Sequence, residues 1–409
     1  MTTLNYGQSA TCEIEAPEIQ TLGPAATPAL TNAEIVRQVR QTLSDPCGYP
    51  PLADAIVPGD RVVVSLEFGL PSSKQITACV LAELLHSGVE PADITLLTPQ
   101  GFSAQDNLSM ALASVDAEEV KQEIHDPDDG DKLALLSVTE SNGALRMNRS
   151  LCEADLVLSC GVFQPGREDQ PQCFSGLFPC FSDRETINRF RSLEAWENHK
   201  AGTDRIAEVE ESSWLLGIGL VVQVIPAPRG GVAEVLAGNP ALVARAGAEK
   251  YRELWVRQAQ QPCDLVVVTV TGDAGEQTWE NLGRALQAAE AVLQEGGSIA
   301  ICSEIAQRPG RSLRRLTEDN DYAVTERKLH RDHSEDSWPA WQLSRALQRG
   351  SVYLRSLLPA STVENLGMTP IASDGELQRL VRSCERCIVL DEAQRLQPTL
   401  DQGTYSRLN

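Results

Sequence analysis

Short apolar runs alternate with longer stretches of helical hydrophobic spacing along most of the chain. The first run, residues 61–66, is rich in valine and predicts a buried strand. Residues 74–86 follow with apolar side chains every three or four positions, which predicts a helix with one buried face. The same order returns after the apolar runs at 94–97 and 155–159. Strands that alternate with helices in this way predict a parallel sheet covered on both faces.

The alternation starts again after a break at residues 260–262, Gln-Gln-Pro. Residues 264–270 form another β-branched run, a helical pattern covers 278–293, and a further apolar run follows at 298–302. This second set predicts a second parallel sheet. The expected fold class is therefore α/β, with two domains that each hold a mostly parallel sheet flanked by helices.

We place the domain boundary at the break near Pro262. This gives an N-terminal α/β domain over residues 31–261 and a C-terminal α/β domain over residues 262–409. Residues 1–30 are rich in Pro, Thr, Ala and Gly without periodicity, which predicts a loose N-terminal arm. The segment 318–338 is charged and aperiodic, which predicts an exposed excursion.

Acidic residues outnumber basic ones, with 57 Asp and Glu against 35 Lys and Arg, so the net charge is −22. A field of this sign repels phosphate backbones and anionic membrane surfaces, which argues against nucleic acid and membranes as partners. A small carboxylate ligand stays compatible with this charge if local cations or helix N-termini receive it.

The N-terminal residues lack both a basic start and an apolar run, so they do not predict a signal peptide. The most apolar window, residues 214–226, is much shorter than the ~20 residues that span a bilayer. The 11 cysteines are scattered and odd in number, which is typical of reduced thiols. The pair Cys384 and Cys387 predicts two core thiols rather than a metal or redox site. We therefore expect a cytoplasmic protein.

Ligands of parallel α/β sheets bind beyond the carboxyl ends of the strands. The loop after the strand at 61–66 carries Glu67, Ser72 and Ser73 and leads into a helix. Either serine can cap that helix, and the backbone amides there can also hold a carboxylate or a phosphate. Both interpretations stay open.

The next two strand-end loops contribute glycines and serines. Gly101 permits a backbone conformation that other residues avoid, and Ser103 either caps the following helix or donates a hydrogen bond. The loop at 161–180 holds Ser175 and Gly176 and is stiffened by prolines. Long structured loops of this kind are often functional.

A fourth loop, residues 272–279, leads into a helix that presents Asn281 and Arg284. Together with Gln277, these side chains are spaced to clamp a carboxylate from one helical face. The alternative is a solvated helix face. The glycines of this loop do not match a dinucleotide-binding fingerprint.

None of the five histidines falls on these four loops, and neither a metalloprotease motif nor a catalytic triad spacing is present. His125 and His199 remain as candidates for proton transfer, because an imidazole titrates near neutral pH. His199 is also the one candidate metal ligand.

Taken in order, these segments resemble the lactate racemase family, whose members use a nickel-pincer nucleotide. The likeness runs from about residue 32 to about residue 394. It is carried by residues 45–52, 61–76, 94–102, 153–157, 173–176, 185–187, 277–284 and 295–299. The order and the spacing of these segments, rather than any single motif, carry the resemblance.

The resemblance implies chemistry at the α-carbon of a 2-hydroxy acid. In that family the pincer cofactor takes a hydride from the α-carbon and returns it to either face. Two histidines on opposite faces exchange the hydroxyl proton. A lysine tethers the cofactor, and another histidine ligates the nickel.

Carried over residue by residue, most of this pattern is missing. The family's phosphate-binding loop begins here at Glu67, and Leu70 stands in place of its arginine. Ser103 stands where the first catalytic histidine is expected, and the tethering lysine is absent after Gly176. The position of the family's nickel-ligating histidine corresponds to the region of Arg191 in this chain. A helix face that helps to hold the substrate survives as Gln277, Asn281 and Arg284, the last in place of a lysine.

The preferred hypothesis is a diverged family member that binds a small carboxylate in a cleft between its domains but lacks pincer-dependent racemisation, so that no cofactor is expected. The rival is an active 2-hydroxyacid racemase or epimerase with a rearranged nickel-cofactor site, in which His125 or His199 transfers the proton. A purely structural or assembly role is the third hypothesis.

Overall fold

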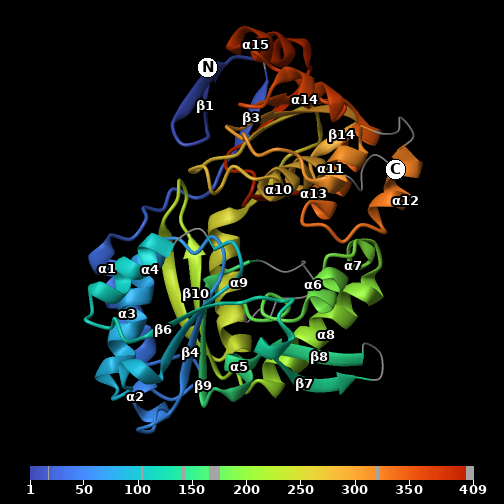
Figure 1. Ribbon diagram of the computed structural model, residues 1–409. Coiled ribbons are helices and arrows are strands. Elements are labelled where there is room, and N and C mark those ends of the chain that lie inside the picture. The colour runs from blue at the N-terminus through green and yellow to red at the C-terminus, as the bar shows by residue number, and fades with distance from the viewer. Residues whose placement is uncertain (17, 103–104, 140–142, 165–175, 318–321, 402–409) are drawn as a thin grey trace. The chain divides into compact units, whose positions relative to one another are not determined.

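The computed structural model describes residues 1–16, 18–102, 105–139, 143–164, 176–317 and 322–401 (Figure 1). The chain forms two compact units. The N-terminal unit comprises Thr27–Phe190 and Asn198–Arg252. The C-terminal unit comprises Met1–Ala26, Arg191–Glu197 and Glu253–Asn409. Within the described ranges, no helix combines the length and the apolar character needed to cross a membrane.

A six-stranded sheet forms the centre of the N-terminal unit, in the order β11-β10-β9-β4-β5-β6. All neighbouring pairs are parallel except β10 and β11. The strands are β4 (Val62–Leu66), β5 (Ile94–Thr98), β6 (Lys121–Ile124), β9 (Leu156–Val162), β10 (Leu220–Pro226) and β11 (Val232–Gly238).

Helices and a small hairpin cover both faces of this sheet (Figure 1). On one face lie α1 (Asn32–Ser44), α2 (Leu52–Ala55), α3 (Ser73–His86) and α4 (Gln105–Ala113). On the other face lie the hairpin β7 (Leu133–Thr139) and β8 (Gly143–Asn148), together with α5 (Arg149–Glu153), α6 (Arg184–Phe190), α8 (His199–Leu215) and α9 (Pro240–Trp255). The short 3-10 helices η1 (Pro91–Asp93) and η2 (Gly130–Lys132) precede β5 and β7.

The valine-rich runs form strands because both of their faces are buried. Val62 and Val64 of β4 join the core beneath α1 and α3, whereas Val63 joins the core on the opposite face. A strand covered on both faces needs apolar residues at successive positions rather than at alternate ones. The predicted α/β class with two mostly parallel sheets is thereby confirmed.

The C-terminal unit holds a second six-stranded sheet, in the order β16-β15-β14-β13-β17-β3, and all of its pairs are parallel. The strands are β3 (Ile19–Leu22), β13 (Cys263–Thr269), β14 (Leu293–Cys302), β15 (Val352–Arg355), β16 (Thr369–Pro370) and β17 (Cys387–Leu390). The other elements of this unit are α7 (Glu194–Glu197), α10 (Trp279–Glu290), α11 (Arg311–Arg315), α12 (Tyr322–Leu329), α13 (Ser337–Arg349), α14 (Ala360–Asn365), α15 (Asp374–Ser383), and the parallel pair β12 (Val256–Ala259) and β18 (Gln397–Leu400).

The prediction of a loose N-terminal arm is wrong for most of its length. β1 (Thr2–Tyr6) and β2 (Ala10–Ile14) form an antiparallel hairpin, and β3 pairs with β17 at the sheet edge. Leu4 and Ile14 are buried against Val267 in the core of the C-terminal unit. The apolar residues of this hairpin alternate with polar ones over only five positions per strand, so the overall composition of the segment concealed the strands.

Two other expectations differ from the structure. The compact units divide inside α9, between Arg252 and Glu253, rather than at Pro262, because β12 pairs with β18 of the C-terminal unit. The segment 318–338 is not an exposed excursion where it is described, since Leu329 and Ser337 are buried.

We predict that Ile14→Ala lowers the free energy of unfolding by about 2–5 kcal/mol, because it removes a fully buried side chain from the core. Leu357→Ala is the matched control, since Leu357 is 66% exposed and its loss is expected to cost less than about 0.5 kcal/mol. Urea unfolding measures both variants. Equal midpoints for the two would contradict the docking of the N-terminal hairpin.

Candidate functional site

The carboxyl ends of four parallel strands of the N-terminal unit, β5, β4, β9 and β10, meet at one edge of the sheet. On the face covered by α8 and α9, the positions nearest this edge change from apolar to polar. Ser65 of β4 pairs with Ser159 of β9, and one step further Gly161 of β9 pairs with Gln223 of β10. Glu67 continues the register of β4 beside Gly161, since its amide donates to the Cys160 carbonyl at 3.1 Å.

Glu67 is buried in a space that two glycines leave for it. A Cβ atom on Gly161 or on Gly176 would collide with its carboxyl group. Its Oε2 accepts a hydrogen bond from the Val162 amide at 3.3 Å, whereas Oε1 is buried without a hydrogen-bond partner in the part of the chain that the structure describes. The side chain therefore faces the interior of the sheet edge rather than solvent, with 6% of the residue exposed.

Burial raises the pKa of Glu67 to about 8, and the hydrogen bond from the Val162 amide offsets only part of this effect. The carboxyl group is therefore mostly protonated at neutral pH. Its charge also raises the pKa of the adjacent buried Cys160 thiol, although burial is the larger cause.

The loop after β4 contains no cationic side chain. Phe68 is 53% exposed, and its ring lies 6.4 Å from that of Phe102 in the loop after β5. Leu70 is buried in the core on the α3 side. Ser72 is the N-cap residue of α3, with a φ of 53° and no capping hydrogen bond from its side chain, and Ser73 is buried at the first helical position. The prediction that the Ser72 side chain caps this helix is therefore wrong.

Of the other site residues that the sequence predicts in these loops, the structure describes the two glycines but not the two serines. Gly101 has a φ of 84°, in the left-handed region that favours glycine, and Gly176 has a φ of 74° beside Glu67. Ser103 and Ser175 lie outside the described residues, and so does the side chain of His199.

His125 follows β6 and is buried, with 1% exposure. Its Nε2 lies 2.9 Å from the Ser182 carbonyl oxygen, which can only accept, so this nitrogen carries the proton. Its Nδ1 accepts a hydrogen bond from the Asn148 side-chain amide at 3.5 Å, and the ring packs edge-on against Phe181. Burial lowers the pKa of His125 below its ordinary value. These contacts make it a neutral residue that positions its neighbours.

Gln277 belongs to the C-terminal unit and is fully engaged within it. Its Oε1 accepts from the Ser303 hydroxyl at 2.7 Å and from the Glu304 amide at 2.9 Å. Its Nε2 donates to the carbonyls of Val270 and Gly272, each at 3.3 Å. A carboxylate ligand would have to displace one of these bonds in order to reach Gln277.

Asn281 and Arg284 lie on the first turns of α10, as predicted. The Asn281 side-chain amide donates to the Glu276 carbonyl at 2.8 Å and to the Glu276 carboxylate at 3.0 Å. Arg284 lies 3.6 Å from Glu280, and 37% of its side chain is exposed. The structure therefore brings Gln277 and Asn281 together around the loop before α10, where they hold that loop, and Arg284 is the residue whose cationic group stays partly open to solvent.

No group of three or more His, Cys, Asp or Glu side chains in the described part of the chain is arranged to hold a metal ion. Arg191, near the predicted nickel-ligating position, lies in the C-terminal unit, 3.2 Å from Glu335. The Cys384 thiol donates to the Val381 carbonyl at 3.0 Å, and burial raises the pKa of both Cys384 and Cys387.

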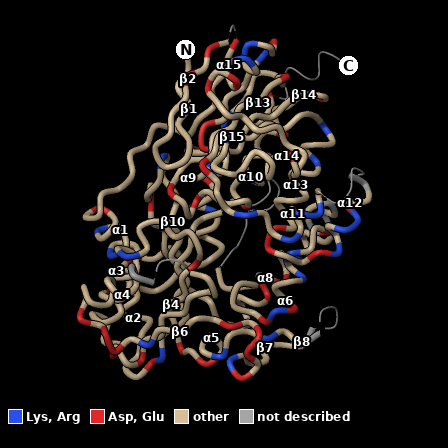
Figure 2. The backbone as a smooth tube through the Cα atoms, turned by 45° about the horizontal axis from the view of Figure 1, so that its top comes forward, with Lys and Arg blue, Asp and Glu red and all other residues tan. Residues whose placement is uncertain are grey.

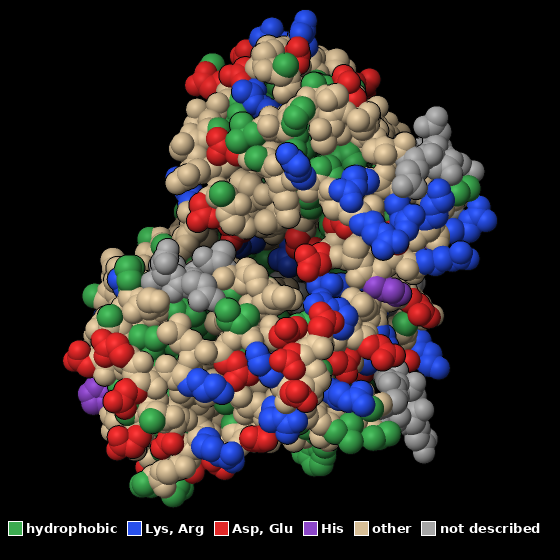
Figure 3. Space-filling view, viewed as in Figure 1, with side chains coloured by type: hydrophobic (Ala, Val, Ile, Leu, Met, Phe, Trp, Pro, Cys, Tyr) green, Lys and Arg blue, Asp and Glu red, His purple; other side chains and the backbone are tan. Residues whose placement is uncertain are grey.

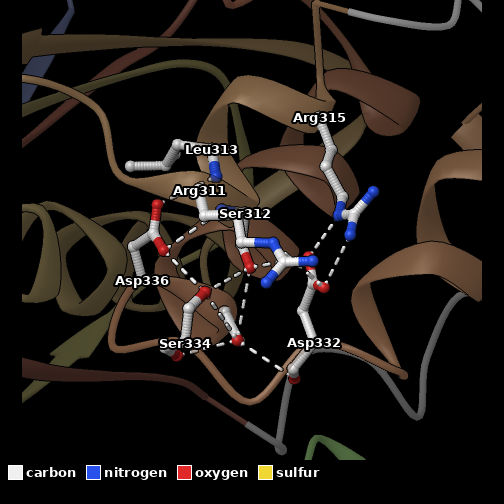
Figure 4. Close-up of polar contacts among 8 residues, drawn as sticks. Arg311, Ser312, Leu313, Arg315, Asp332, Ser334 and Asp336 are labelled. Carbon is white, nitrogen blue, oxygen red and sulfur yellow. Dashed lines mark hydrogen bonds and ion pairs between the residues drawn. The ribbon is translucent and has the colours of Figure 1, made fainter.

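A second polar cluster lies in the C-terminal unit (Figure 4). The Ser312 hydroxyl lies 3.1 Å from Asp332 and 2.6 Å from the Ser334 hydroxyl. Burial alone would raise the pKa of Asp332, but hydrogen bonds from Arg315 and Ser312 hold it below its usual value. Asp336 accepts from the amides of Ser312 and Leu313 and so caps α11. With no imidazole among these contacts, the cluster fastens α11 to α13.

Charged side chains are spread over both units (Figure 2), and basic ones gather over α11 and α12 (Figure 3). The exposed members of this basic patch are Arg308, Arg311, Arg314, Arg327 and Arg331. Arg311 and Arg315 pair with Asp332, so part of the positive charge in this region is neutralised within the unit.

The comparisons with known proteins agree with the resemblance. The family profile of the lactate racemase N-terminal domain matches residues 6–167. The lactate racemase of Thermoanaerobacterium thermosaccharolyticum is 23% identical over 374 residues, which cover 84% of this chain and 85% of that protein. Over most of its length the chain is a distant homologue of this lactate racemase.

The fold of the chain is also that of solved structures. The lactate racemase apoprotein of the same bacterium superposes with a TM-score of 0.80 at 18% identity, covering 98% of this chain and 99% of that one. A protein from Thermotoga maritima superposes with a TM-score of 0.64 at 13% identity, covering 91% and 99%.

The described residues do not fit the nickel-pincer nucleotide that the resemblance implies. The phosphate-binding loop offers a buried acid, Glu67, and a buried apolar side chain, Leu70, where a phosphate needs cations or open donors.

The sequence interpretation missed Ser65, Ser159 and Gln223. Each is a single polar residue inside an apolar strand, at a comparable distance from the strand's carboxyl end. That coincidence across three strands was the available signal, but only the register of the sheet shows that the residues share one face.

We predict that Glu67→Gln stabilises the protein increasingly as the pH rises. Because the folded pKa of about 8 lies above the ordinary value of 4.5, the contribution of the neutral carboxyl is present at low pH and is lost as the pH rises through 8. At about 1.4 kcal/mol per pKa unit, the variant should gain several kcal/mol over the wild type between pH 5 and 9.

Thermal unfolding at each pH measures this difference, with the exposed Glu119→Gln as the control. A difference between Glu67→Gln and the wild type that stays constant over this pH range would show that Glu67 titrates normally.

We predict that Asp336→Ala lowers the free energy of unfolding by about 1–2 kcal/mol, because two amides at the start of α11 lose their acceptor. The exposed Glu364→Ala on α14 is the matched control and should be nearly neutral. Urea unfolding distinguishes the two variants, and an unchanged midpoint for Asp336→Ala would exclude the capping role.

Proposed function

We propose that this lactate racemase family protein binds a small carboxylate of the 2-hydroxy acid type and does not carry out pincer-dependent racemisation. The observation that carries the proposal is the loop after β4, which places a buried carboxyl group at Glu67 and a buried leucine at position 70. Position 70, where the family resemblance implies an arginine, therefore carries no charge with which to hold a nucleotide phosphate.

Racemisation of a 2-hydroxy acid needs a proton-accepting group on each side of the substrate hydroxyl. His125 is committed to Ser182 and Asn148, and burial favours its neutral form. Ser103 replaces the first histidine of the family, and a serine hydroxyl does not transfer protons unaided near neutral pH. The similarity to lactate racemase supports a small carboxylate as the ligand.

The alternative is an active 2-hydroxyacid racemase or epimerase with a rearranged nickel-cofactor site, served by His125 or His199. One observation favours it. Glu67 is a titratable group near neutral pH at the strand ends, where a proton carrier is needed. This alternative still requires a second proton carrier on the opposite face of the substrate.

The two functions are distinguished by co-expressing the protein with enzymes that make the nickel-pincer nucleotide. The lactate racemase of Thermoanaerobacterium thermosaccharolyticum, prepared in parallel, is the positive control. We expect less than stoichiometric nickel and no interconversion of D- and L-lactate. Stoichiometric nickel with racemisation would overturn the proposal in favour of the alternative.

A thermal-shift panel of 2-hydroxy acids tests the binding function separately. We expect at least one acid to raise the unfolding temperature in a concentration-dependent way, because a ligand that binds only the folded state stabilises it. Absence of stabilisation by every acid, together with absence of racemisation, would leave a structural or assembly role.

A further inference from the structure

Four buried polar atoms on one face of the N-terminal sheet have no hydrogen-bond partner among the described residues. They are the hydroxyls of Ser65 and Ser159, the side-chain nitrogen of Gln223 and Oε1 of Glu67. All four residues are at least nine-tenths buried. A buried polar group without a partner costs about 1–3 kcal/mol, so four on adjacent strands call for an explanation.

The register of the sheet places the four side chains next to one another. Ser65 and Ser159 are direct partners on β4 and β9, and neighbouring strands lie about 4.8 Å apart. One step toward the carboxyl edge, Glu67 and Gln223 flank Gly161 from opposite sides. Because Gly161 has no side chain, the carboxyl group of Glu67 occupies the space above it. The four residues form what we call the strand-end donor site.

The hydrogen-bonding character of this site follows from the contact of Glu67 with Val162. Oε2 accepts from the Val162 amide, so a proton on the neutral carboxyl group resides on Oε1. Oε1 is then a donor. The nitrogen of Gln223 is also a donor, and the two serine hydroxyls can rotate to donate. Four neighbouring groups that can each donate a hydrogen bond are complementary to an anionic oxygen.

Among the described residues, no charged side chain shifts the pKa of Glu67, which burial raises and the Val162 amide lowers in part. Within this described part of the chain, the site therefore lacks the cation that usually compensates a carboxylate. A neutral, proton-donating carboxyl group can replace that cation, since it binds an anion through a strong hydrogen bond. The exposed Phe68 and Gly69 directly follow Glu67, so the site lies next to the surface of the strand-end loop.

We propose that Ser65, Glu67, Ser159 and Gln223 form a cation-free anion site that takes the carboxylate of a short-chain acid together with one proton. This inference rests on the proposed function and names the place where the carboxylate binds. Ionised Glu67 would face the bound carboxylate with a like charge, so only the protonated form binds. The affinity is therefore constant at low pH and falls as the pH rises through the titration of Glu67.

Isothermal titration calorimetry with formate, acetate and lactate between pH 6 and pH 9.5 tests the proposal. Above the pKa of about 8, the affinity of the wild type should fall tenfold per pH unit. At pH 8 to 9, titrations in buffers of different ionisation enthalpy should show uptake of up to one proton per ligand. Glu67→Gln should bind with an affinity that does not change over this range, and without proton uptake.

Two further variants test the remaining donors. Ser159→Ala and Gln223→Leu should each weaken binding at least about tenfold at pH 6, as expected when one hydrogen bond to a charged group is lost. The exposed Glu119→Gln is the control and should retain both the affinity and the pH dependence of the wild type. Circular dichroism establishes that each variant is folded before binding is measured.

The outcomes separate this inference from the proposed function. Binding of a carboxylate that is independent of pH in the wild type, with no proton uptake, would place the ligand elsewhere. That result would overturn the strand-end donor site and leave the proposed function standing. If no acid binds at any pH, both fail. If Ser159→Ala and Gln223→Leu bind like the control, the donor site is also excluded.

Discussion

Burial of the Glu67 carboxyl group at the end of a parallel strand is the constraint on which the functional account of this protein depends. The sheet of the N-terminal unit is packed on both faces, and two glycines enclose the carboxyl group within it. An ionised group in such a place is strongly disfavoured, so the protein holds it as a neutral acid. This one protonation state decides whether the strand-end loop repels anions or donates hydrogen bonds to them.

The proposed function separates the fold of the protein from the chemistry at its strand ends. The lactate racemase architecture depends on apolar packing of two parallel sheets, and this packing is intact in both units. Cofactor chemistry depends instead on a few polar side chains at the strand ends, and loops there change without cost to the core. Leu70 shows this separation, since it contributes apolar packing at a position where the family resemblance implies an arginine.

Much of the fold could be predicted from the sequence, because strands buried on both faces are continuous apolar runs such as Val62–Leu66. The short strands β1 to β3 could not, since five residues of alternating character do not stand out from a Pro- and Thr-rich segment. Gln277 and Asn281 were correctly placed at the start of α10, but their use in holding the preceding loop depends on distances that no spacing rule supplies. The grouping of Ser65, Ser159 and Gln223 was hidden for a similar reason, because register across three strands is a tertiary property.

Direct observation of the protonation of Glu67 is the sharpest test of whether this buried carboxyl group is a neutral acid. Infrared difference spectra of the wild type against Glu67→Gln, recorded across a pH titration, report the carbonyl band of a protonated carboxyl group. The account predicts that this band is present at pH 7 and disappears with a midpoint of about 8. A midpoint near the ordinary value of 4.5 would contradict it.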